Sequence, residues 1–186
     1  LKKQLTTFDV PQRWSFIGVY ELPFGKGRPW GTHMPYVANF LVGGWKLGYN
    51  ITQQSGFPVD FPNAPNLEAR SAKLAVDKRD MFKWFDTSLF NKTVPLGEPY
   101  ALRMWPTRFP DVRFMDLHAA DLDLSKDFAI SEGVKLQFRV TCINVSNTPF
   151  FPQMQSLDVT NARFGQLQIN QRNDPRNYYA DFRLVW

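Results

Sequence analysis

Two aspartates one residue apart are the arrangement in this sequence closest to a catalytic pair. In an extended strand Asp121 and Asp123 project from the same face, a separation that could suit the paired carboxylates of glycoside hydrolysis. The same spacing also arises on any polar strand face, and we expect this second role. His33 and His118 are far apart with no third ligand at metal spacing, so no metal site is expected.

Other signals of enzymes and cofactors are weak. No glycine-rich phosphate loop opens a helix, no nucleophile elbow occurs, and no grouping of Ser, His and Asp stands out. The sequence therefore predicts neither a catalysed reaction nor a cofactor.

Aromatic side chains in the middle of the chain are the candidates for contact with a ligand. Trp84, Phe85, Tyr100 and Trp105 could stack on a sugar ring or another flat molecule. Such residues more often pin a large loop to its neighbours, so both roles stay open.

Five segments alternate between polar and apolar residues, with the period of two that is typical of β-strands. They cover residues 13–22, 44–56, 116–128, 134–146 and 177–186 approximately. A turn at 131–133 predicts a hairpin between the third and fourth segments, and residues 36–42 could form a short helix or turn. The polar face of these strands is expected to carry Lys46, Asn50, Asp121, Asp123, Lys135, Gln137, Arg139, Asp181 and Arg183.

Two long stretches, 57–115 and 148–175, lack this periodicity and are interrupted by prolines and polar residues. Stretches of this length are uncommon as loops of a compact domain. They are either functional excursions or carry short elements that the pattern does not reveal.

Composition excludes several classes of protein. The 186 residues carry a net charge of +5, but lysine and arginine are interspersed with acidic residues, so no basic stripe predicts nucleic-acid binding. The one cysteine, Cys142, excludes an internal disulfide and a multi-cysteine metal site. No apolar run approaches the length of about 18 residues that a membrane helix needs.

The strand pattern favours an all-β fold, an antiparallel transmembrane β-barrel segment with long extracellular loops. Long strands, alternating short and long connections and aromatic residues near strand ends are typical of such barrels. An open sheet in hydrocarbon would leave backbone groups unpaired at both edges. Either about three further strands close a small barrel of about eight, or the chain is one arc of a larger wall. The odd number of strands favours the arc.

Several motifs occur in the order found in one family. They are Asp9-Val10-Pro11-Gln12-Arg13, Tyr20-Glu21-Leu22-Pro23-Phe24-Gly25-Lys26-Gly27, Gln54-Ser55-Gly56-Phe57-Pro58, Lys83-Trp84-Phe85-Asp86-Thr87, Asp121-Leu122-Asp123-Leu124-Ser125 and the terminal Phe182-Arg183-Leu184-Val185-Trp186. With these motifs, residues 1–186 resemble the C-terminal β-barrel region of Oar-like TonB-dependent outer-membrane receptors.

The resemblance implies a place in the bacterial outer membrane and a role in taking up a substrate across it. It implies periplasmic turns at 23–43 and 129–133, and outer loops at 57–115 and 148–175. Phe182, Leu184 and Trp186 resemble the C-terminal signal that the barrel-insertion machinery reads. The implied partners are the remainder of the barrel, a plug outside these residues, a TonB-type energy-coupling protein that acts through the plug, and outer-membrane lipid.

Two alternatives from other classes remain open on the sequence alone. One is a soluble β-sandwich module that binds carbohydrate through its loop aromatics. The other is a structural β-protein whose strands at 13–22 and 177–186 pair with other chains.

Overall fold

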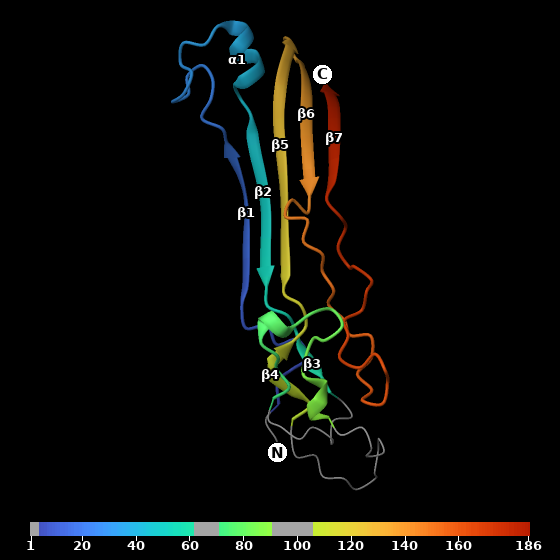
Figure 1. The fold of residues 1–186 in the computed structure, drawn as a ribbon. Helices are drawn as coiled ribbons and strands as arrows, with labels where there is room; N and C mark the ends of the chain where they lie inside the picture. The colour runs from blue at the N-terminus through green and yellow to red at the C-terminus, as the bar shows by residue number, and fades with distance from the viewer. Residues whose placement is uncertain (1–3, 62–70, 91–105) are drawn as a thin grey trace. The chain divides into compact units, whose positions relative to one another are not determined.

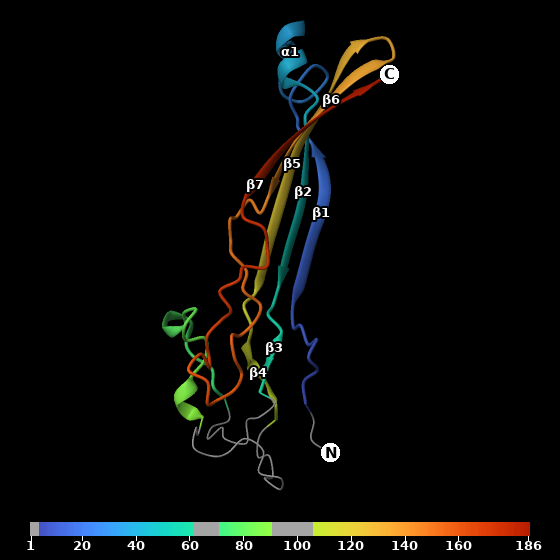
Figure 2. The same ribbon diagram turned by 90° about the vertical axis from the view of Figure 1, so that its right-hand side faces the viewer.

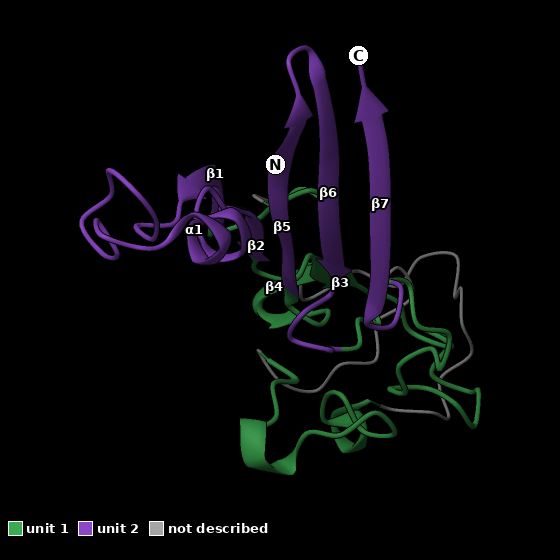
Figure 3. Ribbon diagram, turned by 90° about the horizontal axis from the view of Figure 1, so that it is seen from above, with its two compact units in different colours: residues 1–13, 54–117, 149–173 green, residues 14–53, 118–148, 174–186 purple. Residues whose placement is uncertain are grey.

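The computed structural model describes residues 4–61, 71–90 and 106–186, which form two compact units (Figure 3). Unit 1 comprises 1–13, 54–117 and 149–173, and unit 2 comprises 14–53, 118–148 and 174–186. The long aperiodic stretches thus lie in unit 1 and most of the strand pattern in unit 2. Among the described residues, no helix has the length and apolar character needed to cross a membrane.

Unit 2 is built on one five-stranded sheet with the order β1-β2-β5-β6-β7 (Figure 1). Its strands are β1 (Arg13–Glu21), β2 (Lys46–Gln54), β5 (Leu117–Ser131), β6 (Val134–Ile143) and β7 (Asn177–Val185). Neighbouring strands run in opposite directions in Figure 1, and Figure 2 shows their direction rotating from β1 to β7, as the twist of a sheet requires. The expected antiparallel all-β architecture is confirmed.

The register of the strands assigns each side chain to one face of the sheet. On β5 and β6, Ser125 is opposite Arg139, and Arg139 is in turn opposite Asp181 on β7. One residue along, Leu124 is opposite Val140. We call the side carrying Ser125 and Arg139 the polar face, and the side carrying Leu124 and Val140 the apolar face.

The apolar face of unit 2 is rich in aromatic side chains and is largely uncovered within that unit. The rings of Phe138 and Phe182 are paired across β6 and β7 with their centroids 4.9 Å apart. Phe182 is nevertheless 69% exposed, and Trp14 and Phe16 on β1 are also exposed. No second layer of unit 2 packs over this part of the sheet as it would in a sandwich.

The hairpin between β5 and β6 turns within the residues 131–133 that the strand pattern predicts, so its turn is shorter than the 129–133 that the resemblance implies. Strand β5 continues to Ser131, which pairs with Val134, so the expected turn at 129–133 contains only Glu132 and Gly133 outside the strands. Gly133 has φ = 86°, a left-handed conformation that glycine adopts without a steric penalty.

Strand β6 ends at Ile143, earlier than the expected residue 146, because Asn144 redirects the chain. Asn144 has φ = 52° and is almost fully buried. Its backbone N–H donates to Asp121 Oδ1 at 2.9 Å, and its side-chain amide donates to the carbonyl of Asp174 at 2.9 Å. These hydrogen bonds satisfy the buried amide and fix the end of the strand.

The helix α1 (Tyr36–Val42) lies in the connection between β1 and β2, where the sequence permits a short helix or turn. In Figure 1 it stands at the end of the sheet where β2 begins and the β5–β6 hairpin turns.

In unit 1 the stretch 57–115 carries short elements, one of the two possibilities that the sequence left open. It contains the strands β3 (Pro58–Asp60) and β4 (Arg108–Arg113), which pair antiparallel, and the 3-10 helices η1 (Val76–Lys78) and η2 (Thr87–Leu89). These elements are too short to show a period in the sequence.

A phenylalanine cluster forms the core of unit 1 and joins both aperiodic stretches. Phe61 lies at its centre, with ring centroids 5.1 Å from Phe85, 5.4 Å from Phe90 and 6.0 Å from Phe109. From the second stretch, Phe164 stands 4.9 Å from Phe90 in an edge-to-face arrangement. Burial of these large rings supplies the stability that regular hydrogen bonding does not.

Candidate functional site

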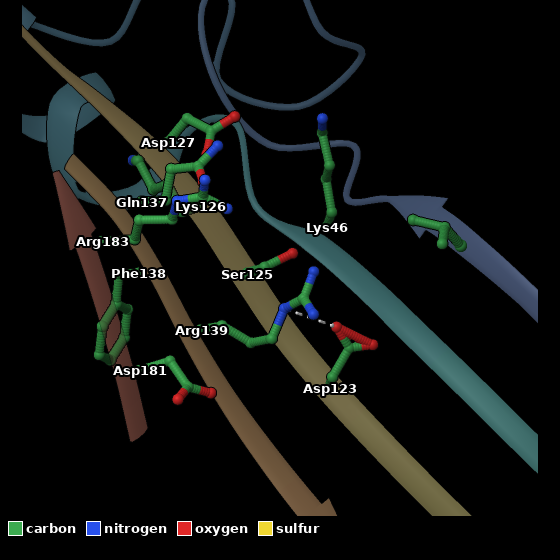
Figure 4. A pocket seen from close by; sticks show the side chains of 11 residues that line it. Lys46, Asp123, Ser125, Lys126, Asp127, Gln137, Phe138, Arg139, Asp181 and Arg183 are labelled. Atoms are coloured by element: carbon green, nitrogen blue, oxygen red, sulfur yellow. Dashed lines mark ion pairs between the residues drawn. The ribbon is translucent and has the colours of Figure 1, made fainter. Parts of the chain in front are cut away.

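The polar face of unit 2 forms a shallow hollow of about 540 Å³ over all five strands of the sheet (Figure 4). Among the residues that line it are six of the predicted polar-face residues, Lys46, Asp123, Gln137, Arg139, Asp181 and Arg183. The structure therefore brings side chains that are up to 137 positions apart in the sequence (46 to 183) onto one surface.

Charges of both signs alternate across this hollow. Arg139 Nε lies 3.5 Å from Asp123 Oδ1, and Arg139 is directly opposite Asp181 in the register of β6 and β7. Gln137 is likewise opposite Arg183. Since the Arg139 side chain is 60% exposed, its ion pair with Asp123 contributes at most about 1 kcal/mol to stability. The charged residues of the hollow are therefore better suited to contacting a polar partner than to holding the sheet together.

The remaining predicted polar-face residues lie beside this hollow. Asn50 and Asp121 line a neighbouring hollow of about 380 Å³, while Lys135 is opposite Val185 near the other end of the sheet. Asp121 accepts the hydrogen bond from Asn144 and Asp123 pairs with Arg139. Each carboxylate thus already has a partner of its own, and their neighbourhood does not resemble an acid–base pair.

Two further residues of the polar face are absent from the predicted set of site residues, although the alternation places one of them, Ser125, on the face of Asp121 and Asp123. Ser125 and Asp127 also line the hollow and are opposite Arg139 and Gln137. Their signal was present, since they continue the two-residue alternation that Asp121 and Asp123 begin.

Lys126 was also missed, and it lies on the opposite, apolar face. The register places it opposite Phe138, yet the residue is only 5% exposed. Its Nζ donates a hydrogen bond to the carbonyl oxygen of Phe40 in α1. The ammonium lies 4.8 Å from the centroid of Phe128, 5.6 Å from that of Trp45 and 5.9 Å from that of Phe40. Desolvated cation–π contacts of this kind contribute about 2 kcal/mol.

The four aromatic residues predicted as ligand contacts differ in what the structure shows of them. Phe85 is fully buried in the core of unit 1, so its assignment as a ligand contact is corrected. Trp84 is partly buried, its indole N–H donates to the carbonyl of Arg113 at 2.7 Å, and the Arg79 guanidinium lies 4.9 Å from its ring centre. Tyr100 and Trp105 lie outside the described residues.

The candidate C-terminal signal extends the apolar face. Phe182 and Leu184 are opposite Phe138 and Leu136 on β6, and Trp186 follows the end of β7 with 88% of its surface exposed.

Two carboxyl groups of unit 1 have a perturbed acidity. The side-chain and backbone donors of Ser88 hold the pKa of Asp86 below its ordinary value. Backbone and side-chain hydrogen bonds from Thr160 likewise lower the pKa of Asp158. Both arise from short local turns and do not indicate catalysis.

Within the part of the chain that the structure describes, no three residues among His, Cys, Asp and Glu are grouped so that they could hold a metal ion.

Comparison with known families identifies one relationship. A family model described as an outer membrane beta barrel domain matches residues 1–178, which include strands β1 to β6 and the start of β7. Comparison with curated proteins and with solved structures gives no significant match.

Proposed function

Because this chain belongs to the outer membrane beta barrel domain family and is located in the bacterial outer membrane, we propose that it forms the C-terminal portion of a TonB-dependent receptor. In the intact receptor this portion is barrel wall, and the whole takes up a substrate across the membrane. The observation that carries the proposal is the two-faced sheet of unit 2, with charged residues on one side and aromatic and aliphatic residues on the other.

The polarity of the two faces indicates which side of the barrel wall faces the lumen and which faces lipid. In a membrane barrel, lipid-exposed residues are apolar and alternate with polar residues that face the water-filled or plugged interior. The hollow with Lys46, Arg139 and Asp181 therefore faces the lumen, and Leu136, Phe138 and Val140 face lipid. The lumen residues contact a plug or a passing solute, and no chemical reaction is assigned to them.

The open edges of the sheet support a larger barrel. Strands β1 and β7 each have one neighbour in the five-stranded sheet of the described residues. In hydrocarbon every unpaired backbone group is costly, so both edges must pair with further strands. The remainder of the barrel supplies them.

The finer assignment to TonB-dependent transport rests on the ordered motifs that resemble Oar-like receptors. A plug in the remainder of the protein would transmit energy from a TonB-type partner in the inner membrane. Phe182, Leu184 and Trp186, which end the last strand on its apolar face, would be read by the insertion machinery.

Labelling of single cysteines in the full-length protein tests the orientation of the wall. With Cys142 replaced by serine, cysteines at 136, 138 and 140 are expected to react with reagents confined to lipid. Cysteines at 137 and 139, which alternate with them along β6, and at 181, which is opposite 139 on β7, are expected to be protected from those reagents. The reverse pattern would refute the orientation.

Uptake requires a second test, in the native host. Photo-cross-linking of the full-length receptor is expected to capture a TonB-type protein, and removing that protein is expected to abolish the growth benefit that the receptor confers on limiting nutrients. If the growth benefit is unchanged without the energy-coupling protein, the barrel acts passively and the proposal of TonB-dependent uptake is wrong.

A further inference from the structure

The helix α1 is fastened to the apolar face of the sheet by its C-terminal carbonyl groups. Lys126 Nζ donates to the carbonyl of Phe40, and Trp45 Nε1 donates to the carbonyl of Leu41 at 2.9 Å. The last carbonyls of a helix lack intrahelical partners and carry partial negative charge, so a cation and an indole N–H suit them. The ring of Phe40 also packs on Phe128, with centroids 5.1 Å apart.

The outer side of α1 is apolar and largely exposed, and the one ring contact of Tyr36 among the described residues is with Phe40 of the same helix, with centroids 6.4 Å apart. Tyr36 is 80% exposed, Val37 68% and Leu41 58%. The polar side chain of Asn39 does not contribute to this exposed side, because its Oδ1 accepts a hydrogen bond from the backbone N–H of Lys26 at 2.6 Å. An exposed side of this composition is out of place in a turn that is surrounded only by water.

A lysine in a lipid-facing row also needs an explanation. A cation is costly at the middle of a bilayer and tolerated near its surface. Lys126 is two residues from Phe128 along β5 and lies within reach of Trp45, so it belongs to a group of aromatic side chains at the end of the sheet. Aromatic residues of this kind gather at the level of the lipid headgroups.

We propose that α1 is an interfacial anchor, a short helix that lies at the membrane surface on the outside of the barrel wall. The partner of its exposed apolar side is membrane phospholipid, and Tyr36, Val37 and Leu41 enter the lipid just below the headgroups. The exposed apolar side of α1 is continuous with the lipid-facing side of the sheet through Phe40 and Phe128, which is why lipid and not water covers it. Lys126 is a positioning residue that holds the helix against the wall. The inference rests on the proposed orientation of the two faces.

Fluorescence quenching of the full-length protein in vesicles tests the anchor. The vesicles contain phosphatidylethanolamine, phosphatidylglycerol and phosphatidylcholine brominated either near the headgroup or deep in the acyl chain. A bimane label is placed at Leu41→Cys, with Val140→Cys as the lipid control and Glu132→Cys in the neighbouring turn as the aqueous control, all in a Cys142→Ser background.

The label at 41 is expected to lose most of its fluorescence to lipid brominated near the headgroup and little to aqueous iodide. The label at 140 is expected to respond to bromine deeper in the membrane, and the label at 132 to iodide alone. If 140 is not quenched by lipid, the proposed orientation fails, and with it the basis of the anchor. If 140 is quenched while 41 responds to iodide alone, the anchor itself is overturned. Protection of 41 from both quenchers would mean a protein partner, which also overturns the lipid anchor.

Variants of Lys126 test its positioning role. With the label at 41, Lys126→Met is expected to lower quenching by lipid and raise quenching by iodide, while Lys126→Arg retains the original pattern because a guanidinium can still donate to the helix carbonyl. The label at 140 should be unchanged in both variants, which shows that the wall is still inserted. Identical quenching at 41 in the Met and Arg variants would show that Lys126 does not position the helix.

Discussion

The carboxylate of Asp123 on β5 lies across the backbone of Gly48 on β2. A Cβ atom added at position 48 would stand 1.7 Å from Asp123 Oδ2 and 2.6 Å from its Cγ, distances at which the side chain must move. Gly48 is therefore the residue that lets Asp123 lie flat on the polar face and reach Arg139.

Replacing this glycine should disturb the polar face. Gly48→Ala is expected to displace Asp123, break its ion pair with Arg139 and destabilise the sheet by about 1–3 kcal/mol, the usual cost of overpacking. The temperature at which the full-length barrel loses its heat-modifiable mobility in electrophoresis measures this effect. Asn50→Ala, on the same face of the same strand, serves as the control and should change it little.

A second substitution distinguishes the clash from a general weakening of β2. Asp123→Ala removes the obstructing carboxylate, so the double variant Gly48→Ala/Asp123→Ala should recover most of the stability that the single variant loses. A double variant as unstable as Gly48→Ala would contradict the steric explanation.

The core of unit 1 should depend on Phe85 and not on its neighbour Phe82. Phe85 is fully buried among Phe61, Phe90 and Phe164, whereas Phe82 is 69% exposed. Phe85→Ala is expected to cost about 3–5 kcal/mol in the stability of this unit, while Phe82→Ala should cost well under 1 kcal/mol. Susceptibility of the unit to proteolysis in rising urea measures the difference, and equal susceptibility of the two variants would refute the assigned core.

Arg113 should be difficult to replace even by lysine. Its guanidinium donates to the Asp9 carboxylate at 2.6 Å, to the Asp9 carbonyl at 2.9 Å, to the Gly56 carbonyl at 3.1 Å and to the Pro110 carbonyl at 2.8 Å. Lysine keeps the charge but cannot reproduce this fork of donors. Arg113→Lys is expected to destabilise unit 1 by about 2–3 kcal/mol, since each hydrogen bond of a charged group is worth about 1.5–3 kcal/mol.

The same proteolysis assay measures the effect of Arg113→Lys. Arg163→Lys, a substitution of the same kind at an exposed position of the unit, is the matched control and should be neutral. If both variants resist protease equally, the hydrogen bonds of Arg113 do not organise the unit.

The turn at Asp86 should weaken in acid. The Ser88 hydroxyl and backbone N–H, with distances of 2.6 Å and 3.0 Å to Asp86 Oδ1, lower the pKa of this carboxyl, and Lys83 adds a smaller effect of the same sign. A lowered folded-state pKa stabilises the fold above the unfolded value of about 3.9, and this stability is lost as pH falls through the folded value.

Ser88→Ala removes the hydroxyl donor, so the pKa of Asp86 should rise toward its ordinary value, and the variant should lose less stability on acidification. Ser88→Thr keeps the hydroxyl and should behave like the native protein. NMR titration of the Asp86 side chain in the full-length protein checks both expectations, and equal pKa values in the Ala and Thr variants would contradict the role of the hydroxyl.

The strands of unit 2 could be read from the sequence. Alternation of polar and apolar residues depends only on the two-residue period of a strand, so it located β1, β2, β5, β6 and β7 and assigned Arg139 and Asp181 to one face. The ordered motifs indicated an outer-membrane barrel, and the family match bears out that coarser assignment.

The roles of residues whose partners are distant in the chain become visible only in the folded protein. Phe61 and Phe164 meet in one core although no periodic pattern links them, because burial of an aromatic ring depends on its neighbours in space. Lys126 interrupts an apolar row in the sequence. Its position is explained only in the folded protein, where its ammonium donates to a carbonyl of α1 and lies close to three aromatic rings. A period can be read from local sequence, whereas a contact between remote segments exists only after the chain has folded.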